Sequence, residues 1–369
     1  MSEEVLWKKI EGGVFVIAEI GKNFIQSEEE KPVLEYLKNA KKLALAAKEA
    51  GADAVKFQTH NVEDEQIQTK VVSPHFKGMD RYSWVKRNTL VTPLEGFWKP
   101  LKAYCDQIGI TFFSTPMSRG AAEIVEKIGV DLWKVGSGDI LDFVMLDYLT
   151  QTKKPIILSA GMSTLEELDL ALNFLKKRKS KFALLHCVSQ YPCPLEKLNL
   201  STLEYFKERY ECPIGFSDHS VGEQVALAAV KQGAKIIEKH FSFGRDLWGS
   251  DHKVSMTPKE MKEMIDKIRL LEKKIFVGTD EQLIKKAMGK KGKILQEDEA
   301  VFRPFFRKAL VAGCEIKKGE KIQPEMIYAM RPQAYIAGLH SEEYEKIVGK
   351  VAKKKFSKYE PFDIDSIYN

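Results

Sequence analysis

Two histidines stand out between residues 214 and 256, where the chain reads IGFSDHS, a helix-length stretch, KIIEKHFSF and GSDHKVSM. His219 and His240 each end a strand-like run, and the acids Glu238 and Asp251 lie close by in sequence. Imidazole is a common ligand of divalent transition metals, and two strand ends in one sheet bring both rings within reach of one ion. Either histidine alone could instead be a hydrogen-bonded core residue. We predict a metal site, because similar polar endings recur along the chain.

Lysines and serines end other strand-like runs. Lys56 and Lys134 close two of them, and glycines accompany Ser137 and Ser159. Glycine lets backbone amides approach an oxyanion, and lysine supplies positive charge, so we expect a ligand that carries phosphate and carboxylate. Serines can also satisfy turns, and a barrel lysine can pair with a glutamate. The other polar endings are Glu19, Gln58, Ser114, Thr115, Asp139, His186, Ser189, Ser217, Asp218 and Glu238.

Eight short β-rich runs must position these side chains, and each precedes a plausible amphipathic helix. Eight strand-then-helix units favour a closed parallel (β/α)8 barrel over an open doubly wound sheet. The first turn, AEIGKNF, also lacks the GxGxxG expected of such an open sheet. In a barrel the chemistry lies at the carboxyl ends of the strands, and alternation turns Lys56 with Gln58, and Glu238 with His240, inward. The predicted strands span 14–20, 54–58, 111–114, 132–135, 156–159, 183–187, 214–217 and 236–241, and the clearest helices 33–50, 93–108, 118–128, 164–177, 221–232 and 257–276.

The chain of 369 residues divides into three parts. We expect the barrel over residues 1–277 and a charged, lysine-rich linker with some helix over 278–304. Residues 305–369 hold short β-like runs, a turn at KKGE and a polar helix-like stretch over 341–348. They predict a small α+β domain whose thin core leans on another surface.

The overall charge is nearly balanced, with 58 Lys and Arg against 52 Asp and Glu, and the net charge of +6 is spread along the chain. The densest basic run, 285–293, is broken by Ala, Met and Gly, so it indicates a solvated helix end rather than a nucleic-acid patch. Five scattered cysteines without a close CxxC pair indicate free thiols. No run reaches the roughly 18 apolar residues of a membrane span. We predict a soluble cytoplasmic protein with neither a nucleic-acid nor a membrane partner.

A series of motifs runs in order through nearly the whole chain. They are AEIGKN, GADAVKFQT, FFSTPMSR, KVGSGD, ILSAGMST, LLHCVSQYP, IGFSDHS, EKHFSF and GSDHKVSM, followed by IKKGE and MRP. Together they resemble the sialic acid synthase family, the bacterial N-acetylneuraminate synthases and their relatives. The resemblance implies an α/β fold with a (β/α)8 TIM barrel and a C-terminal antifreeze-like (SAF) domain. It implies a transferase that condenses phosphoenolpyruvate with an open-chain N-acetylated hexosamine to a nine-carbon 2-keto acid and phosphate, uses Mn²⁺ or Mg²⁺, and forms a domain-swapped homodimer.

The resemblance also implies roles for individual residues. His219 and His240 match the metal ligands. Glu19 matches the glutamate that faces the pyruvyl carbons, where it stabilises positive charge at C2 or orients the attacking water. Arg331 matches a sugar-contacting position, and its side chain would enter the partner's barrel. The catalytic positions are Glu19, Lys56, Lys134 and Asp139; the phosphoenolpyruvate-binding ones Lys56, Thr115, Lys134, Ser137, Ser159, Ser189, Tyr191 and Ser217; and the sugar-binding ones Gln58, Asp251 and Arg331.

The chain departs from the family pattern at three places. Phe24 and Ile25 stand where many members carry a histidine and an acid. Asp139 stands where many bacterial members have glutamate, so a metal-bound water could be held differently. The terminal motif MRPQAYIAG lacks the common RPGxG pattern, which leaves the pose of Arg331 open.

Several functions remain open at this point. The acceptor could be N-acetylmannosamine or a 2,4-diacetamido-6-deoxy sugar of the legionaminic type, because loops rather than strand ends would decide it. A 3-deoxy-octulosonate 8-phosphate synthase would need extra basic residues for its phosphosugar, and the two-histidine pattern speaks against it. A noncatalytic barrel with an ice-binding domain would want a flat array of threonines, which the lysine-rich terminal segment lacks.

Overall fold

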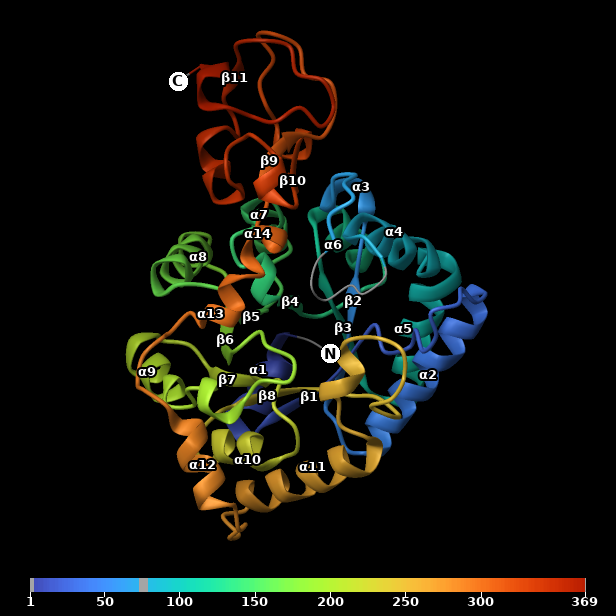
Figure 1. Ribbon diagram of the computed structural model, residues 1–369, viewed down its shortest axis with the longest axis vertical. Helices are drawn as coiled ribbons and strands as arrows, with labels where there is room; N and C mark the ends of the chain where they lie inside the picture. Colours follow the sequence, from blue (N-terminus) through green and yellow to red (C-terminus); the bar gives the residue numbers. More distant parts are fainter. Residues whose placement is uncertain (1–2, 73–78, 369) are drawn as a thin grey trace.

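The computed structural model describes residues 3–72 and 79–368. Eight parallel strands form one sheet in the order β3-β2-β1-β8-β7-β6-β5-β4. The end strands β3 and β4 are neighbours in space, so the sheet curls into a nearly closed barrel, as predicted (Figure 1). The strands are β1 Phe15–Gly21, β2 Ala54–Thr59, β3 Thr111–Pro116, β4 Trp133–Val135, β5 Ile156–Ser159, β6 Phe182–Cys187, β7 Ile214–Asp218 and β8 Ile236–His240.

Strand register brings the polar endings together. Almost every strand residue is buried, as in other parallel sheets whose faces are both covered. Within the ladder, Glu19 of β1 is level with Lys56 of β2 on one side and with His240 of β8 on the other. Ser217 of β7 is level with Glu238 of β8. The backbone pairing therefore places the predicted side chains in one layer at the carboxyl ends of the strands.

Helices surround the barrel largely where the sequence predicts them. The predicted helix over 93–108 begins as a wider π-helical turn, Leu94–Trp98, before α5, because Pro100 in the first turn of α5 has no N–H to donate backwards. The surrounding helices are α2 Val33–Glu49, α5 Lys99–Ile108, α6 Arg119–Glu126, α7 Phe143–Gln151, α8 Leu165–Lys177, α9 Thr202–Arg209, α10 Gln224–Lys231 and α11 Pro258–Glu272.

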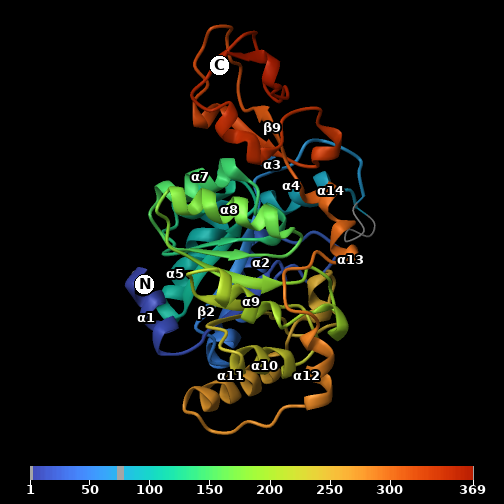
Figure 2. The same ribbon diagram turned by 90° about the vertical axis from the view of Figure 1, so that its left-hand side faces the viewer.

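Three helical pieces lie outside the predicted strand-then-helix units and the linker. The helix α1 Glu3–Gly12 lies on the opposite side of the barrel from α13 and α14 (Figure 2). Two more, α3 Val62–Glu65 and α4 Arg81–Val91, lie in the long connection after β2. Asn61 and Asp80 begin these two helices by accepting hydrogen bonds from the amides of the first turn.

The segment between the barrel and the terminal domain is packed rather than extended. It contains α12 Glu281–Met288, α13 Glu297–Ala300 and α14 Arg303–Phe306, and it runs along the barrel toward the terminal domain (Figure 2). The Leu200 amide donates to the Ala287 carbonyl at 2.9 Å. The fully buried Glu299 carboxylate accepts hydrogen bonds from the amides of Met162 and Ser189 at 3.0 and 2.7 Å. Helix α13 is thereby fixed at the rim of the barrel.

The terminal domain is small and leans on the barrel. It pairs β9 Ala309–Ala312 with β10 Ile327–Met330, and β11 Val351–Ala352 with β12 Ile367–Tyr368, both antiparallel. The stretch predicted as helix-like over 341–348 is a 3₁₀ helix, Ser341–Lys346. Figure 1 shows the domain beside α3, α7 and α14. The Ser341 hydroxyl donates to the Leu141 carbonyl at 2.7 Å, and Tyr344 donates to Asp147 at 3.2 Å.

All five cysteines are free thiols. Across residues 3–72 and 79–368, the structure contains no helix with both the length and the apolar character needed to cross a bilayer.

Candidate active site

A cavity of about 180 Å³ opens at the carboxyl ends of the strands, where a barrel of this type carries its chemistry. Among the predicted site residues, all except Arg331 line it. These lining residues are Glu19, Lys56, Gln58, Thr115, Lys134, Ser137, Asp139, Ser159, Ser189, Tyr191, Ser217, His219, His240 and Asp251.

One part of the cavity, the lysine half, consists of Lys56, Lys134, Glu19, Glu238 and the serines around them. Lys56 Nζ lies 2.6 Å from Glu19 Oε2 and 3.8 Å from Glu238 Oε2. Lys134 Nζ donates to Ser159 Oγ at 2.6 Å and lies 3.9 Å from Glu238 Oε1. All four charged side chains are almost completely buried. Each lysine already faces a carboxylate, so an anion that enters the cavity has to compete with Glu19 and Glu238 for the two positive charges.

Burial changes the acidity of these groups. Burial raises the pKa of Glu19 to about 7, against the opposing effect of Lys56 and with help from the negative charge of Glu238. Burial also lowers the pKa of Lys134. A carboxyl group with a pKa near 7 can exchange its proton at neutral pH, which is the range that acid–base chemistry requires.

A narrow cradle of hydroxyl groups lies beside the lysines. A Cβ atom at Gly161 would lie 2.5 Å from Ser137 Oγ and 2.4 Å from Ser189 Oγ, so any larger residue at this position would displace both hydroxyl groups. The Gly161 amide donates to Ser137 Oγ at 3.1 Å. Ser189 Oγ is buried and, within the described residues, has no hydrogen-bond partner. A buried hydroxyl without a partner is costly, and an anionic ligand would satisfy it.

The two histidines meet as the sequence predicts, with ring centroids 5.4 Å apart. His219 Nδ1 donates to the Val188 carbonyl at 2.7 Å, which directs Nε2 toward another partner. Against the effect of burial, the neighbouring Cys187 raises the pKa of His219 to about 8, so an ion that binds at Nε2 has to displace a proton there. Burial lowers the pKa of His240 to about 4, so this ring is neutral at pH 7. His240 Nδ1 is buried without a hydrogen bond among the described residues and lies 4.0 Å from Asp251 Oδ2.

This donor set fits a divalent ion held by two imidazole nitrogens. Neutral imidazole with a carbonyl behind it is the usual form of a metal-binding histidine. In the part of the chain that the structure describes, no group of three or more His, Cys, Asp or Glu side chains is arranged to hold a metal. Water or substrate oxygens would therefore supply the other ligands of an ion bound here.

The rest of the cavity is the loop half, and sequence reasoning missed all of its residues except Asp251. Its residues follow the strands or lie in the connections between them, where no strand alternation predicts their direction. The signal that could have found two of them is proximity: Lys22 lies within the AEIGKN motif, and His60 is two residues beyond Gln58. The loop half consists of Lys22, His60, Arg81, Trp84, Trp248 and Asp251.

Arg331 lies behind the cavity rather than in its lining. The fully buried guanidinium forms an ion pair with Asp139 of the same chain, and Lys308 Nζ lies 2.9 Å from the same carboxylate. The backbone around Arg331 forms a parallel bridge with Gln66, at the end of α3. Asp139 therefore faces two cations of the terminal domain at the edge of the cavity.

The altered first loop has a hydrophobic role. Phe24 is fully buried and packs against Tyr36, Phe57 and Phe97, with ring centroids 6.4, 6.2 and 4.9 Å away. Ile25 lines the cavity. The histidine and acid of the family pattern are thus replaced by one core residue and one apolar wall.

Comparison with known proteins identifies the family and agrees with the fold. Residues 43–280 match the NeuB family and residues 307–366 match the SAF domain. The chain is 33% identical to N,N'-diacetyllegionaminic acid synthase of Campylobacter jejuni over 87% of this chain and 93% of that protein. It is 30% identical to N-acetylneuraminate-9-phosphate synthase of Mus musculus over 85% of this chain and 82% of that protein. The crystal structure of SpsE from Bacillus subtilis, a spore coat polysaccharide biosynthesis protein, superposes with a TM-score of 0.75 at 30% identity, covering 97% and 96% of the two chains. The chain therefore belongs to the NeuB family.

Proposed function

We propose that this protein condenses phosphoenolpyruvate with an open-chain N-acetylated hexosamine, N-acetylmannosamine or a similar sugar, and water to a nine-carbon 2-keto sugar acid and phosphate. The observation that carries the proposal is the placement of two buried lysines and an unpartnered serine hydroxyl beside a pair of histidines in one cavity. Its relatives are named as synthases of sugar acids of this type.

The lysine half suits phosphoenolpyruvate. Lys56 and Lys134 offset the charge of its phosphate and carboxylate, and Ser137, Ser159 and Ser189 donate to their oxygens. Thr115 lies 2.9 Å from Lys56 Nζ and orients it. Binding releases the two lysines from part of their pairing with Glu19 and Glu238. The remaining members of the proposed phosphoenolpyruvate pocket are Tyr191 and Ser217.

The reaction forms one carbon–carbon bond and one C2–O bond to water, and it breaks the C2–O bond to phosphate. C3 of phosphoenolpyruvate attacks the aldehyde carbon of the sugar, and the aldehyde oxygen takes up a proton to become a hydroxyl group. Water adds to C2 and loses both of its protons, which balance the proton on the new hydroxyl group and one on the departing phosphate. Phosphate leaves with the electrons of its bond to C2, so that C2 becomes a ketone. Glu19, as a carboxylate, stabilises the positive charge that develops at C2 or orients this water.

The acceptor sugar is placed against the other wall. Gln58 Nε2 donates to Glu19 Oε1 at 3.0 Å, so a sugar held by Gln58 lies next to the reacting carbons. Asp251 accepts from sugar hydroxyl groups, and Asp139 faces the same space from the edge. A divalent ion, Mn²⁺ or Mg²⁺, held by His219 and His240 would polarise the sugar aldehyde as a Lewis acid.

Two acceptors deserve a direct comparison. A 2,4-diacetamido-2,4,6-trideoxy-mannose is the alternative to N-acetylmannosamine, because one relative is named for diacetyllegionaminic acid. Phosphate release from phosphoenolpyruvate should be measured with each sugar, with and without Mn²⁺.

The same assay tests the metal. We expect phosphate release to require a sugar, to stop with a chelator and to return with Mn²⁺ or Mg²⁺. We expect His219→Ala to weaken metal binding without unfolding the barrel. Full turnover in rigorously metal-free protein would remove the metal from the proposal.

We also propose that the protein works in the cytoplasm as a domain-swapped homodimer in which Arg331 completes the partner's sugar site by pairing with Asp139 at its edge. In the present structure Arg331 meets Asp139 within one chain, and α13 is fixed on its own barrel. A swap would form the same contacts between two chains by re-orienting the short segment 301–307 after α13.

Heterodimers of two inactive chains test this assembly. An Arg331→Ala chain mixed with a His240→Ala chain should recover part of the activity, because one site then joins an intact barrel to an intact arginine from the other chain. If the arginine acts within its own chain, every barrel carries one defect and no activity returns. Native mass spectrometry must first confirm that the heterodimer has formed.

A further inference from the structure

Lys22 is the lysine of the cavity that has no carboxylate partner. It follows β1 directly and lines the cavity beside Trp84, with Nζ 5.2 Å from the centre of that ring. Its hydrogen bond runs to a histidine, His60 Nε2, at 3.1 Å. Among residues 3–72 and 79–368, Lys22 forms no ion pair and no second hydrogen bond. An ammonium group has three protons to donate, so two of them remain for a ligand.

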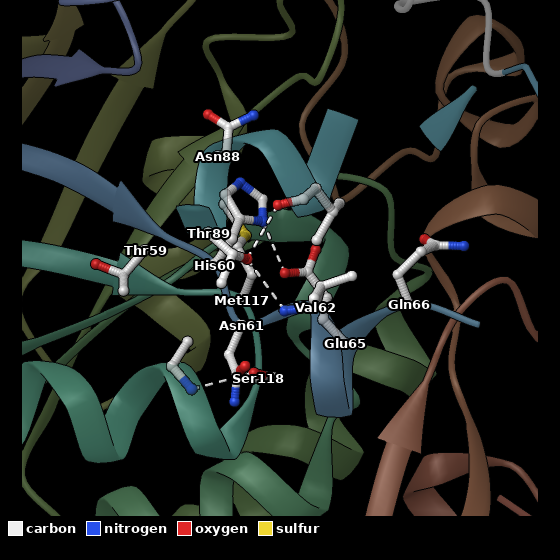
Figure 3. A network of polar contacts seen from close by, with 12 residues as sticks. Thr59, His60, Asn61, Val62, Glu65, Gln66, Asn88, Thr89, Met117 and Ser118 are labelled. Carbon is white, nitrogen blue, oxygen red and sulfur yellow. Dashed lines mark hydrogen bonds and ion pairs between the residues drawn. The ribbon is translucent and has the colours of Figure 1, made fainter. Parts of the chain in front are cut away.

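The pair of His60 and Glu65 holds this lysine in place. His60 Nδ1 lies 2.7 Å from Glu65 Oε2, and both side chains are buried (Figure 3). Burial would raise the pKa of Glu65, but His60 and the charges of Arg331 and Arg81 lower it to about 2. The carboxylate therefore takes the Nδ1 proton as a hydrogen bond, and Nε2 presents its lone pair to the Lys22 ammonium.

His60 can accept from Lys22 only while its ring is neutral. Burial lowers the pKa of His60 to about 4, so the ring stays neutral throughout the physiological range. Burial also lowers the pKa of Lys22 to about 8, which leaves the ammonium form dominant at pH 7. The charged or titratable groups that act on Lys22 are His60, Asp251, Glu65, Arg81 and Glu19.

We propose that Lys22 is an acceptor-binding residue that donates to a hydroxyl group of an uncharged sugar, while Asp251 accepts from that sugar on the same wall. This inference rests on the proposed function. Lys22 and Asp251 both line the cavity and attract each other electrostatically, so their charges cancel at this wall. One donor and one acceptor together match a hydroxyl-bearing sugar, whose oxygens both donate and accept.

A phosphorylated acceptor fits this wall less well. Arg81 is the other cation of the loop half, but its Nε donates to Gln66 at 3.0 Å and its guanidinium stacks 4.4 Å from the Phe306 ring. A phosphate near Lys22 would also approach the Asp251 carboxylate, which repels it. The mouse relative is named for a 9-phosphate product, so a sugar 6-phosphate is the competing acceptor to test.

The variant Lys22→Met removes the ammonium and keeps most of the side-chain length. We expect KM for N-acetylmannosamine to rise about 10- to 100-fold, the range for a lost hydrogen bond to a charged group, with KM for phosphoenolpyruvate nearly unchanged. The matched control is Lys42→Met on the exposed face of α2, which should leave both constants unaltered.

Deoxy analogues show which oxygen Lys22 contacts. Wild-type protein and Lys22→Met are compared on N-acetylmannosamine, its 4-deoxy and 6-deoxy forms and its 6-phosphate. In the wild type, removing the hydroxyl group that Lys22 contacts should raise acceptor KM. In Lys22→Met, the increase in KM for that one deoxy sugar should be at least about fivefold smaller, because the variant lacks the ammonium that donates to this hydroxyl group. Equal penalties for every analogue in both proteins would overturn the proposal. If Lys22→Met lost turnover only with the 6-phosphate, the group that Lys22 contacts would be a phosphate instead of a hydroxyl group.

The pH profile separates binding by Lys22 from a structural role. With the pKa of Lys22 near 8, kcat/KM for the acceptor should fall as pH rises through about 8. Lys22→Arg should move this fall to higher pH, and His60→Phe should raise acceptor KM by removing the anchor of Lys22. A Lys22→Met protein that keeps the wild-type alkaline fall contradicts the assignment. If the wild type itself releases no phosphate with any sugar, the proposed function fails instead, which is a different result.

Discussion

The two halves of the cavity are built in different ways. In the lysine half, Lys56, Lys134 and Ser159 belong to β2, β4 and β5, and the ladder register of the sheet sets their positions. In the loop half, Lys22 and His60 follow strands, and Trp248 lies in the connection after β8. A position set by backbone hydrogen bonds cannot shift without disturbing the barrel, whereas a loop position can. The cavity thus combines a rigid half with an adaptable half, and the proposed function assigns phosphoenolpyruvate to the first and the acceptor to the second.

The two halves also differ in how their charges are balanced. Lys56 and Lys134 each face a buried carboxylate, whereas the ammonium of Lys22 relies on a neutral imidazole. Breaking a buried ion pair leaves an uncompensated charge and is strongly destabilising. Substitutions in the lysine half should therefore cost both activity and stability, and those in the loop half mainly acceptor binding.

The largest effect is expected at the reacting centre. Glu19→Gln keeps the hydrogen bond with Gln58 but removes the carboxylate, and kcat should fall about 10²- to 10⁴-fold. In the wild type, kcat should also fall as pH drops through about 7, because protonation neutralises this group. Steady-state kinetics from pH 5 to 9 measures both effects. Glu49→Gln, on the exposed end of α2, serves as the control, and a variant with normal kcat would exclude Glu19 from the chemistry.

A smaller effect is expected for one lysine of the phosphoenolpyruvate site. Lys134→Ala should weaken phosphoenolpyruvate binding by about 1.5 to 3 kcal/mol, the contribution of a hydrogen bond to a charged group. Titration calorimetry with phosphoenolpyruvate alone measures this loss, and the exposed Lys176→Ala is the control. Unchanged affinity in Lys134→Ala would move the phosphate and carboxylate away from this half.

The smallest effect concerns mobility. Adding the acceptor should slow amide hydrogen exchange about 3- to 10-fold in the loop 243–254, because ligand contacts suppress local opening there. Exchange in β5 and β6 should hardly change, since their ladder already limits opening to rare events. Protection of the strands without protection of the loop would reverse the division between a rigid and an adaptable half.

Sequence reasoning found the lysine half because two regular patterns constrain it: the alternation of side chains along each strand and the repeat of strand-then-helix units along the chain. Strand alternation correctly turned Lys56 with Gln58, and Glu238 with His240, into the cavity. The same reasoning cannot separate His219 from His186, because both lie near the ends of strand-like runs. His186 Nε2 contacts the Leu198 carbonyl at 2.7 Å and its ring stacks on Phe216, so it is a core histidine.

Most of the loop half could not be predicted, because Arg81, Trp84 and Trp248 join the cavity only in three dimensions. Arg81 is 59 residues from Lys22 along the chain, and Trp248 is farther still, yet all three line one wall. The docking of Arg331 on Asp139 depends on how the terminal domain packs, which no local pattern specifies. Motif resemblance named both residues without indicating that they would meet.

The junction between β3 and β4 gives the terminal domain a role in the assembly of the barrel. Within the described sheet these two strands are adjacent but share no ladder. Lys308 Nζ donates to the Met117 carbonyl just after β3 at 2.6 Å and pairs with Asp142 after β4 at 2.6 Å. Both sides of the junction are therefore joined by a residue that leaves the ribosome only after the whole barrel sequence. The barrel acquires this last connection late in synthesis, so the two domains should reach their final stability together.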